Sequence, residues 1–244
     1  MDSPSIAPLV ADLLARMAHL DFCLMKRAPT FPDIQVGSDL DLLCSDPKAI
    51  SAIAEEVWLR DSSRNRKLVL SERSETHTHV DLIDEKLVLR LDVYAKLPEF
   101  GGVRFRPELT RQILAGRRLT SFSSVVLESR VEIFEPSEPH DLLIRLAEYA
   151  AFYWVGPDKI HHVDAILKAS QATRDEALSL LHDWMELPPS GQVMHEKSVQ
   201  PRSKATLRAR TRSIIVTGAH SQFGQKIGRS RFGSSLKPLL RKAL

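Results

Sequence analysis

The chain has 244 residues, of which 43% are hydrophobic and 27% are charged, and its formal net charge is +3. This length suits one medium domain or two small ones, and the hydrophobic fraction is large enough for a real core. No apolar run approaches the roughly 20 residues of a membrane-spanning helix, the first residues lack the basic start of a signal peptide, and two cysteines, Cys23 and Cys44, are too few for a disulfide framework. We therefore expect a cytoplasmic protein without a membrane span.

Basic residues are concentrated at the C-terminal end of the chain. Residues 195–244 hold 12 of the 34 lysines and arginines but only one of the 31 acidic residues, Glu196. A tail of this kind can bind nucleic acid, an acidic membrane surface or another polyanion. A solvated extension without a specific partner is the simpler alternative, and the sequence leaves both open.

The first predicted elements are a helix, a short strand and a longer strand. Apolar residues recur with helical spacing over 6–20. Residues 21–27 can form a strand that ends in the two cations Lys26 and Arg27. After a proline-containing turn, residues 36–44 have the pattern of a buried strand that also carries two carboxylates.

Asp39 and Asp41 are the chemically interesting part of the strand at 36–44. Side chains alternate along a strand, so these two carboxylates share one face while Leu40 and Leu42 point into a core. Two acids about 7 Å apart on one rigid face repel each other, and a divalent cation is the usual compensation. Oxygen ligands suit Mg²⁺ or Mn²⁺, which commonly serve phosphoryl chemistry. An Asp-x-Asp is also common in exposed strands, so the motif alone leaves both interpretations open.

A helix and a further strand are expected next. Asp46 and Pro47 are typical of a helix start, with Asp as the N-cap and Pro in the first turn. Apolar residues continue with helical spacing as far as Trp58. Residues 60–67 are polar and basic and should form a loop, and residues 67–71 can form a strand.

Residues 76–83 and 87–95 are predicted to form a β-hairpin whose register follows from side-chain alternation. In each strand one face is polar and the other apolar. Only an even register matches polar with polar and apolar with apolar residues. Pairing Leu82 with Leu89 satisfies this condition.

The same register predicts which polar residues are neighbours. It sets Asp81 opposite Arg90 and His79 opposite Asp92. Asp81 then has its own cation, whereas Asp92 has no arginine or lysine directly opposite. Asp92 is therefore the better candidate to complete a metal site with the two aspartates of the strand at 36–44, and Asp81 is the reserve candidate.

His77 and His79 form a His-x-His pair on the first strand of the hairpin. Such a pair can bind zinc. The sequence supplies no cysteines or further histidines at the usual zinc-ligand spacing. We therefore expect both histidines to be exposed or to lie outside the direct coordination of a metal.

Beyond the hairpin the chain is expected to become helical. Residues 96–121 are basic and should be rich in loops, and residues 125–134 should form a strand. Helices are predicted over 140–154, 159–170 and 173–187.

Thr173 and Glu176 form a capping box, which is typical of a helix that begins at Thr173. The Pro-Pro-Ser-Gly run that starts at Pro188 marks a boundary after this helix.

The run from Gly37 to Leu42, Gly-Ser-Asp-Leu-Asp-Leu, followed by a hairpin with Asp92, resembles the nucleotidyltransferase superfamily of the DNA polymerase β type. Members of that family carry Ser-Asp-x-Asp-Leu on one strand and a third aspartate on a neighbouring strand. The resemblance covers roughly residues 20–190, and the chain looks like divergent bacterial members linked to surface-polysaccharide synthesis. The expected fold is α+β, with a mixed β-sheet nucleotidyltransferase core over 1–137, a helical region over 138–190 and a basic extension over 191–244.

This resemblance implies a transferase that depends on Mg²⁺ (or Mn²⁺) and moves a nucleotidyl group from an NTP donor to a hydroxyl acceptor on a small molecule, a sugar or a polymer. In the family three carboxylates hold two Mg²⁺ ions. Carried over, Asp39, Asp41 and Asp92 would be the metal ligands and catalytic residues. Asp92 could also help to deprotonate the acceptor.

One departure concerns phosphate binding. Family members usually have an upstream Gly-Ser motif whose backbone cradles the phosphates, but Lys26 and Arg27 stand in the corresponding segment, and Gly37 and Ser38 directly precede the aspartates. Lys26 and Arg27 would bind phosphate through charge, with Gly37 and Ser38 as the other candidate substrate-binding residues. The departure leaves open a phosphosugar-transferring relative and a non-catalytic binding protein, and the basic tail leaves open an RNA-modifying relative.

Overall fold

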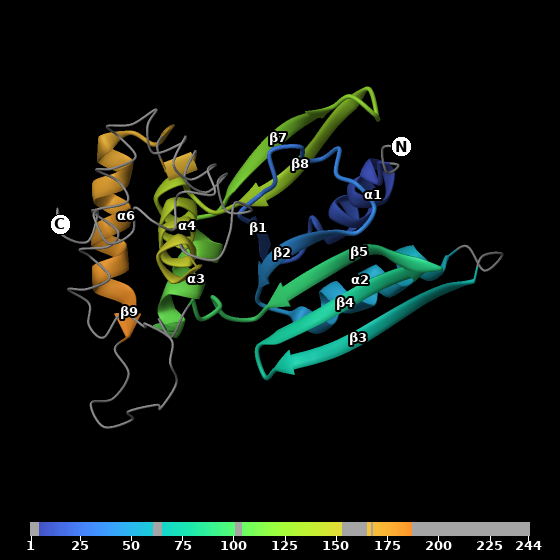
Figure 1. Ribbon diagram of the computed structural model, residues 1–244, viewed down its shortest axis with the longest axis horizontal. Helices are drawn as coiled ribbons and strands as arrows, with labels where there is room; N and C mark the ends of the chain where they lie inside the picture. The colour runs from blue at the N-terminus through green and yellow to red at the C-terminus, as the bar shows by residue number, and fades with distance from the viewer. Residues whose placement is uncertain (1–4, 61–64, 101–103, 153–164, 167, 187–244) are drawn as a thin grey trace, which may run out of the picture. The chain divides into compact units, whose positions relative to one another are not determined.

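The computed structural model describes residues 5–60, 65–100, 104–152, 165–166 and 168–186. Within these ranges the chain forms a five-stranded mixed sheet, two two-stranded sheets and five α-helices (Figure 1). The prediction of an α+β fold with a mixed sheet is therefore confirmed. None of the helices in the described ranges is long and apolar enough to cross a membrane.

The chain divides into two compact units. One consists of Met1–Pro98 and Pro107–Ser137, and the other of Glu99–Arg106 and Glu138–Leu244. The first unit holds the five-stranded sheet and all the candidate site residues.

The strands of the large sheet follow the order β1-β2-β5-β4-β3. Their bounds are Phe22–Met25 for β1, Ser38–Cys44 for β2, Arg66–Ser74 for β3, His77–Asp84 for β4 and Lys86–Tyr94 for β5. Strands β2 and β5 run parallel, whereas the other neighbouring strands run antiparallel. A parallel pair cannot be joined by a tight turn, and here α2, β3 and β4 lie between its two strands in sequence.

The register predicted for the β4–β5 hairpin is confirmed. Leu82 pairs with Leu89, and the pairing of His79 with Asp92 follows from it. The alternation of buried and partly exposed residues along both strands agrees with this register, because a slip by one residue would have moved the apolar side chains out of the core.

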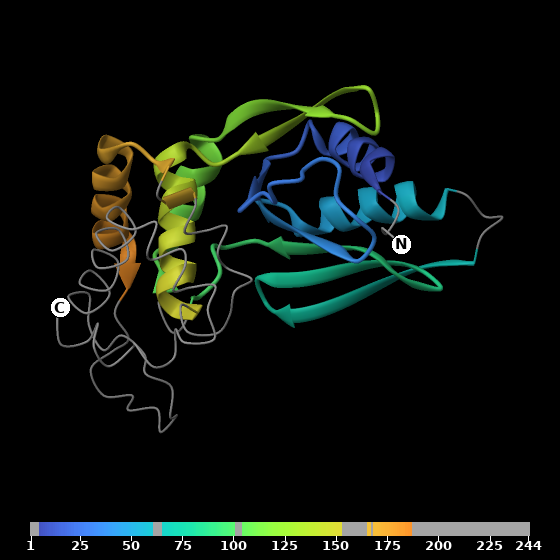
Figure 2. The same cartoon turned by 45° about the horizontal axis from the view of Figure 1, so that its top comes forward.

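Helices α1 (Ala7–Met17) and α2 (Pro47–Leu59) cover one face of the large sheet (Figure 2). The carboxylate of Asp46 caps α2, because its Oδ1 accepts hydrogen bonds from the backbone N–H groups of Lys48 and Ala49, both at 3.1 Å. A cap of this kind stabilises a helix by about 1 kcal/mol. The predicted start of this helix is thus confirmed.

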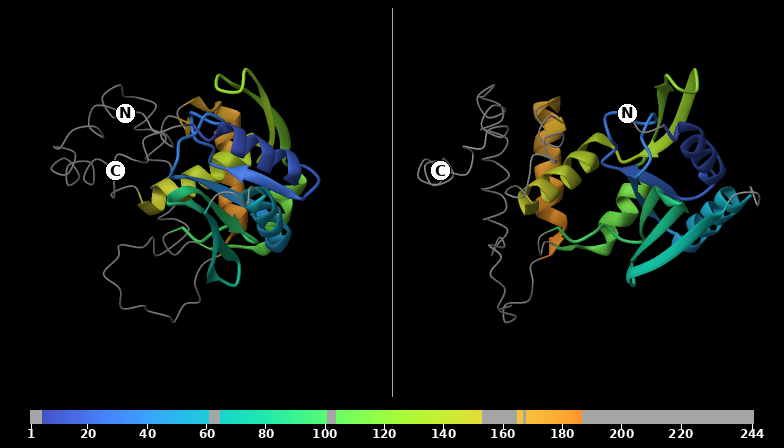
Figure 3. Two further views of the ribbon diagram at one scale, coloured as in Figure 1. Left: turned by 90° about the vertical axis from the view of Figure 1, so that its right-hand side faces the viewer. Right: turned by 45° about the vertical axis from the view of Figure 1, so that its right-hand side comes forward.

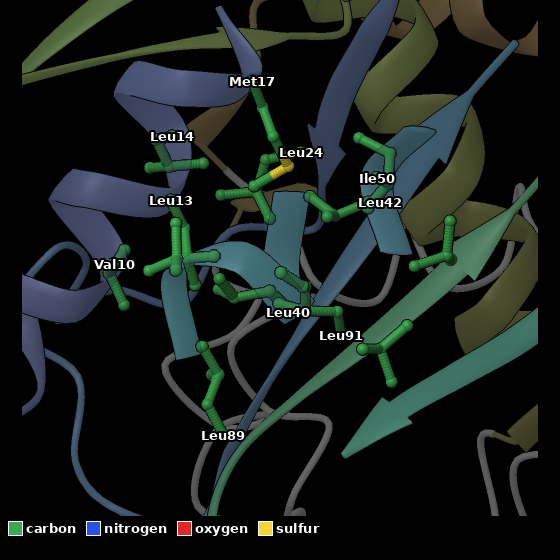
Figure 4. Close-up of a cluster of buried hydrophobic side chains, with 14 of the residues drawn as sticks. Val10, Leu13, Leu14, Met17, Leu24, Leu40, Leu42, Ile50, Leu89 and Leu91 are labelled. Carbon is green, nitrogen blue, oxygen red and sulfur yellow. The ribbon is translucent and has the colours of Figure 1, made fainter. Parts of the chain in front are cut away.

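The core lies between these two helices and the sheet. Leu40 and Leu42 of β2 and Leu91 of β5 point towards α1, and Leu42 and Leu91 are fully buried (Figure 4). Burying a leucine of this kind contributes about 1.5–3 kcal/mol. Because Leu40 and Leu42 occupy the core face of β2, the side chains of Asp39 and Asp41 lie on the opposite face.

The expectation that residues 96–121 form mostly loop is wrong. They contain helix α3 (Pro107–Ala115) and most of strand β7 (Arg118–Ser124). Leu109 and Ile113 are four residues apart, one turn along α3, and both are fully buried. Helix α3 packs against β2, so the basic composition of this segment belongs to its exposed side.

The strand expected over Val125–Phe134 begins later than predicted. Strand β8 (Ser129–Glu135) pairs with β7 in a separate hairpin (Figure 3). Val125 lies in the turn between them and is 85% exposed, so its apolar character did not indicate a strand. Strand β8 lies against β1 and α1.

The second unit contains helices α4 (Glu138–Phe152) and α6 (Gln171–Trp184), which pack against each other. A two-stranded sheet joins β6 (Arg104–Phe105) to β9 (Met185–Glu186). Apart from a few residues, the helix predicted over 159–170 lies outside the described ranges, and the basic extension 191–244 lies wholly outside them.

The predicted start of α6 is wrong by two residues. Ser170, and not Thr173, has the capping role, because its Oγ accepts the hydrogen bond from the backbone N–H of Thr173 at 3.1 Å. Helix α6 therefore begins at Gln171.

Candidate functional site

One row of paired residues crosses the large sheet on the face away from α1 and α2. In the order of the strands it consists of Met25, Asp41, Asp92, His79 and Ser71. Paired residues in neighbouring strands have Cβ atoms about 4.5–5.5 Å apart. The register therefore places two carboxylates and an imidazole side by side on one rigid surface.

The adjacent row contains the other two aspartates that the sequence singled out. Asp39 pairs with Arg90, and Arg90 pairs with Asp81. Arg90 donates two hydrogen bonds to Asp81, from Nε to Oδ1 at 2.6 Å and from Nη2 to Oδ2 at 2.9 Å. These bonds hold the pKa of Asp81 below its ordinary value. Asp81 is thus engaged by its own cation, and Asp92 is the aspartate that lies next to Asp41.

The carboxyl group of Asp92 has a raised pKa. Its pKa is raised from 3.8 to about 6, first because burial penalises the carboxylate and then because the negative charges of Asp41 and Asp39 repel it. The positive charges of Arg90 and Lys26 oppose this shift only in part. A cation bound beside Asp92 would relieve the same repulsion.

Lys26 supplies part of the positive charge at the site. It follows β1 with a φ of 48°, and its Nζ lies 3.0 Å from Oδ2 of Asp41. The two side chains are only 12% and 19% exposed, so the ion pair is shielded from solvent. Lys26, expected to bind phosphate, is therefore in direct contact with one of the expected metal ligands.

The other expected phosphate-binding residues lie elsewhere. Arg27 pairs with Glu135, with Nε 2.9 Å from Oε1, and its guanidinium lies 4.1 Å from the ring centre of Phe122. Ser38 pairs with the core residue Leu89, so its side chain lies on the face opposite to the carboxylates. Gly37 has a φ of 89° and its N–H donates to the carbonyl oxygen of Val88 at 2.8 Å; glycine adopts this left-handed conformation at little cost.

His77 and His79 lie beside Asp92 and are not exposed. Their Nε2 atoms are 4.0 Å and 3.2 Å from Oδ1 of Asp92, and their side chains are 21% and 16% exposed. The ring of His77 also stacks on Tyr94, with centroids 4.1 Å apart and planes 17° from parallel. Of the two alternatives predicted for these histidines, exposure is therefore wrong, and a position beside the carboxylates is the one that remains. The signal was present in the predicted register, which already set His79 opposite Asp92.

Two buried polar atoms of this group have no hydrogen-bond partner within the described part of the chain, Nε2 of His77 and Oδ1 of Asp92. His79 approaches Asp92 to 3.2 Å, but the contact is not aligned as a hydrogen bond. Burial lowers the pKa of His77 to about 4, and burial together with the charge of Arg90 lowers that of His79. The imidazole of His77 is therefore neutral at pH 7.

A separate concave surface of about 950 Å³ lies on the other side of the sheet, where α1 and α2 meet the β4–β5 turn. It is lined by apolar residues together with charged ones such as Arg60, Arg66 and Lys86. None of the candidate site residues lines it. The aspartates and histidines of the candidate site thus lie on the opposite face of the sheet from this concave surface.

Among the described residues, His77, His79 and Asp92 are the group of three whose ligand atoms lie close enough together for one metal ion. Asp39, Asp41 and Asp92 offer carboxylate oxygens from two neighbouring strands, and these are the ligands that Mg²⁺ prefers.

Comparisons of the chain with protein families, with curated proteins and with solved structures gave no match.

Proposed function

We propose that the protein is a Mg²⁺-dependent nucleotidyltransferase that moves a nucleotidyl group from an NTP to a hydroxyl acceptor. The supporting observation is that Asp41 and Asp92 are directly paired across parallel strands, with Asp39 two residues from Asp41 on the same face. The pKa of Asp92 is raised first by burial and then by the negative charges of Asp41 and Asp39, and a bound cation would relieve the repulsion among the three carboxylates.

Each residue has a distinct part in the proposed reaction. Asp39, Asp41 and Asp92 would hold the metal, which when bound would activate the acceptor hydroxyl and stabilise the leaving pyrophosphate. Asp92 could also accept the proton of the acceptor hydroxyl. Lys26 would leave Asp41 when a cation replaces it there, and its ammonium would then be available for a phosphate oxygen.

A non-catalytic binding protein of the same fold is the second candidate, and the ion pair between Lys26 and Asp41 favours it. The ammonium group lies 3.0 Å from Oδ2 of Asp41 and supplies a positive charge where a metal would bind. A protein in which this pair is permanent would keep the fold without binding Mg²⁺ at Asp41.

The test of the enzymatic proposal is transfer of label from an α-labelled NTP to a hydroxyl acceptor in the presence of Mg²⁺. Substituting asparagine for Asp39, Asp41 or Asp92 should reduce transfer by at least about 100-fold, because each change removes a ligand charge. The matched control is Glu55→Gln, an exposed carboxylate on α2 on the opposite side of the sheet. Transfer that survives all three aspartate substitutions would show that the assigned residues are not the active site.

A further inference from the structure

His77, His79 and Asp92 bring three metal-binding atoms together. These atoms, two imidazole nitrogens and a carboxylate oxygen, all lie within 4.8 Å of one another. Oδ1 of Asp92 is 3.2 Å from Nε2 of His79 and 4.0 Å from Nε2 of His77. Zinc bonds of about 2.0–2.2 Å at tetrahedral angles place ligand atoms about 3.3–3.6 Å apart. The distance from Asp92 to His79 is close to that in a bound metal site, whereas the distance to His77 is longer, so His77 would have to move closer to bind a metal.

The sheet itself produces this spacing. His77 and His79 are two residues apart on β4, so their side chains share a face. Asp92 is paired with His79 on the neighbouring strand β5. Tyr94, paired with His77, stacks on the His77 ring and restricts its orientation. Ligands on two paired strands are held more rigidly than ligands on a loop.

A second observation independent of the spacing is that two of the three ligand atoms lack partners. Nε2 of His77 and Oδ1 of Asp92 are buried, and neither has a hydrogen-bond partner in the part of the chain that the structure describes. A buried polar atom without a partner costs about 1–3 kcal/mol. One metal ion bound between these atoms would satisfy both.

We propose that His77, His79 and Asp92 form a binding site for a divalent first-row transition metal ion such as Zn²⁺. Two imidazole ligands favour such ions over Mg²⁺ and Ca²⁺, which prefer oxygen ligands. Three protein ligands leave a coordination position open for water or for a further ligand. Asp41, the next residue in the same cross-strand row, is the nearest carboxylate in register that could take this position.

This metal site does not depend on the proposed nucleotidyl transfer. The two sites share Asp92, and also Asp41 if it takes the open position, but the histidines belong only to the transition-metal site and Asp39 only to the Mg²⁺ site. Substitutions of His79 and Asp39 therefore separate the two proposals.

The test is titration of the full-length, chelator-treated protein with Co²⁺, followed by visible absorption, and with Zn²⁺, followed by calorimetry. We expect one equivalent to bind through these residues. Substituting alanine for His77 or His79 should weaken Co²⁺ and Zn²⁺ binding by at least about tenfold. His19→Ala, which removes an exposed histidine after α1, and Asp39→Asn should leave it unchanged.

A measurement on the wild type covers the case in which a histidine variant does not fold. Zn²⁺ should shift the imidazole ¹⁵N resonances of two histidines by the amount typical of metal-bound Nε2, and selective labelling should assign them to His77 and His79. Absence of Co²⁺ and Zn²⁺ binding, shifts confined to other histidines, or affinity retained in the folded His77→Ala/His79→Ala double variant would overturn the proposal.

Discussion

Asp41 on β2 is paired directly with Asp92 on the parallel strand β5. No tight turn brings these two residues together, because 50 positions separate them in the chain and a parallel pair needs a long crossover. The fold thus places two like charges next to each other. Their repulsion adds to the effect of burial in raising the pKa of Asp92. A cation bound between the two carboxylates would reduce this repulsion.

The first prediction concerns the stability of the metal-free protein. The pKa of Asp92 rises from 3.8 unfolded to about 6 folded, so its stabilising contribution is fully present below about pH 4 and is lost as the pH rises through 6. At pH 7.5 Asp92→Asn should therefore be more stable than the wild type, by up to about 3 kcal/mol. Urea unfolding in the presence of a chelator measures this difference.

The same comparison at pH 4 provides the control. The difference between Asp92→Asn and the wild type should shrink there to less than about 1 kcal/mol, because at pH 4 the wild-type carboxyl is protonated in the folded state and still close to half protonated in the unfolded state. His77, whose pKa is lowered to about 4, acts in the opposite sense and loses its contribution as the pH falls, so variant and wild type must be compared at each pH. An equal loss of stability in the variant at both pH values would argue against the raised pKa.

The second prediction concerns Lys26. Lys26→Met removes the shielded partner of Asp41 and should lower the free energy of unfolding by about 1–3 kcal/mol without metal. Mg²⁺ should then raise the melting temperature of the variant more than that of the wild type, because it no longer competes with the ammonium. Differential scanning fluorimetry with and without Mg²⁺ measures both effects. A smaller Mg²⁺ response in the variant would indicate that Lys26 does not compete with a metal at Asp41.

The third prediction concerns Arg90, whose positive charge lowers the pKa of Asp92. Arg90→Met should therefore move the pKa of Asp92 above 6, and should also raise the pKa of Asp81, which loses both hydrogen bonds. Carboxyl ¹³C titration by NMR follows both residues separately. If the pKa of Asp92 fell or stayed constant, the assigned electrostatic coupling would be incorrect.

The fourth prediction tests the position of Leu42 in the core. Leu42 is fully buried in the core beneath the carboxylates, so Leu42→Ala should lower the free energy of unfolding by about 2–5 kcal/mol. Leu70→Ala, on the exposed strand β3 where the side chain is 53% exposed, should change it by less than about 0.5 kcal/mol. Urea unfolding of the two variants measures this contrast, and similar losses in both would place Leu42 outside the core.

The hairpin register could be predicted because polar and apolar residues alternate over the middle of both strands, although the pairing shifts by one residue between Leu82 and Ile83. Leu82 and Leu89 had only one arrangement that kept both in the core. The start of α2 at Asp46 could also be predicted from the sequence, because the capping aspartate and the proline that follows it are local signals.

Other features depend on contacts that are distant in the sequence. The ion pair between Lys26 and Asp41 requires the antiparallel pairing of β1 with β2 and the left-handed turn at Lys26, and no local pattern indicates it. Helix α3 was not predicted because the segment is rich in basic residues. Pro107 at its start and the spacing of Leu109 and Ile113 are nevertheless typical of a helix. Strand β7 has a polar sequence that is stabilised by pairing with β8.

The most direct measurement for the proposed function is the effect of NTPs on the melting temperature of the full-length, chelator-treated protein, with and without Mg²⁺. We predict that at least one NTP raises the melting temperature only when Mg²⁺ is present. Asp41→Asn should abolish this increase and Glu55→Gln should preserve it. If no NTP stabilises the wild type with Mg²⁺, or if the stabilisation is the same in Asp41→Asn, the carboxylates of β2 and β5 do not form a nucleotidyltransferase site.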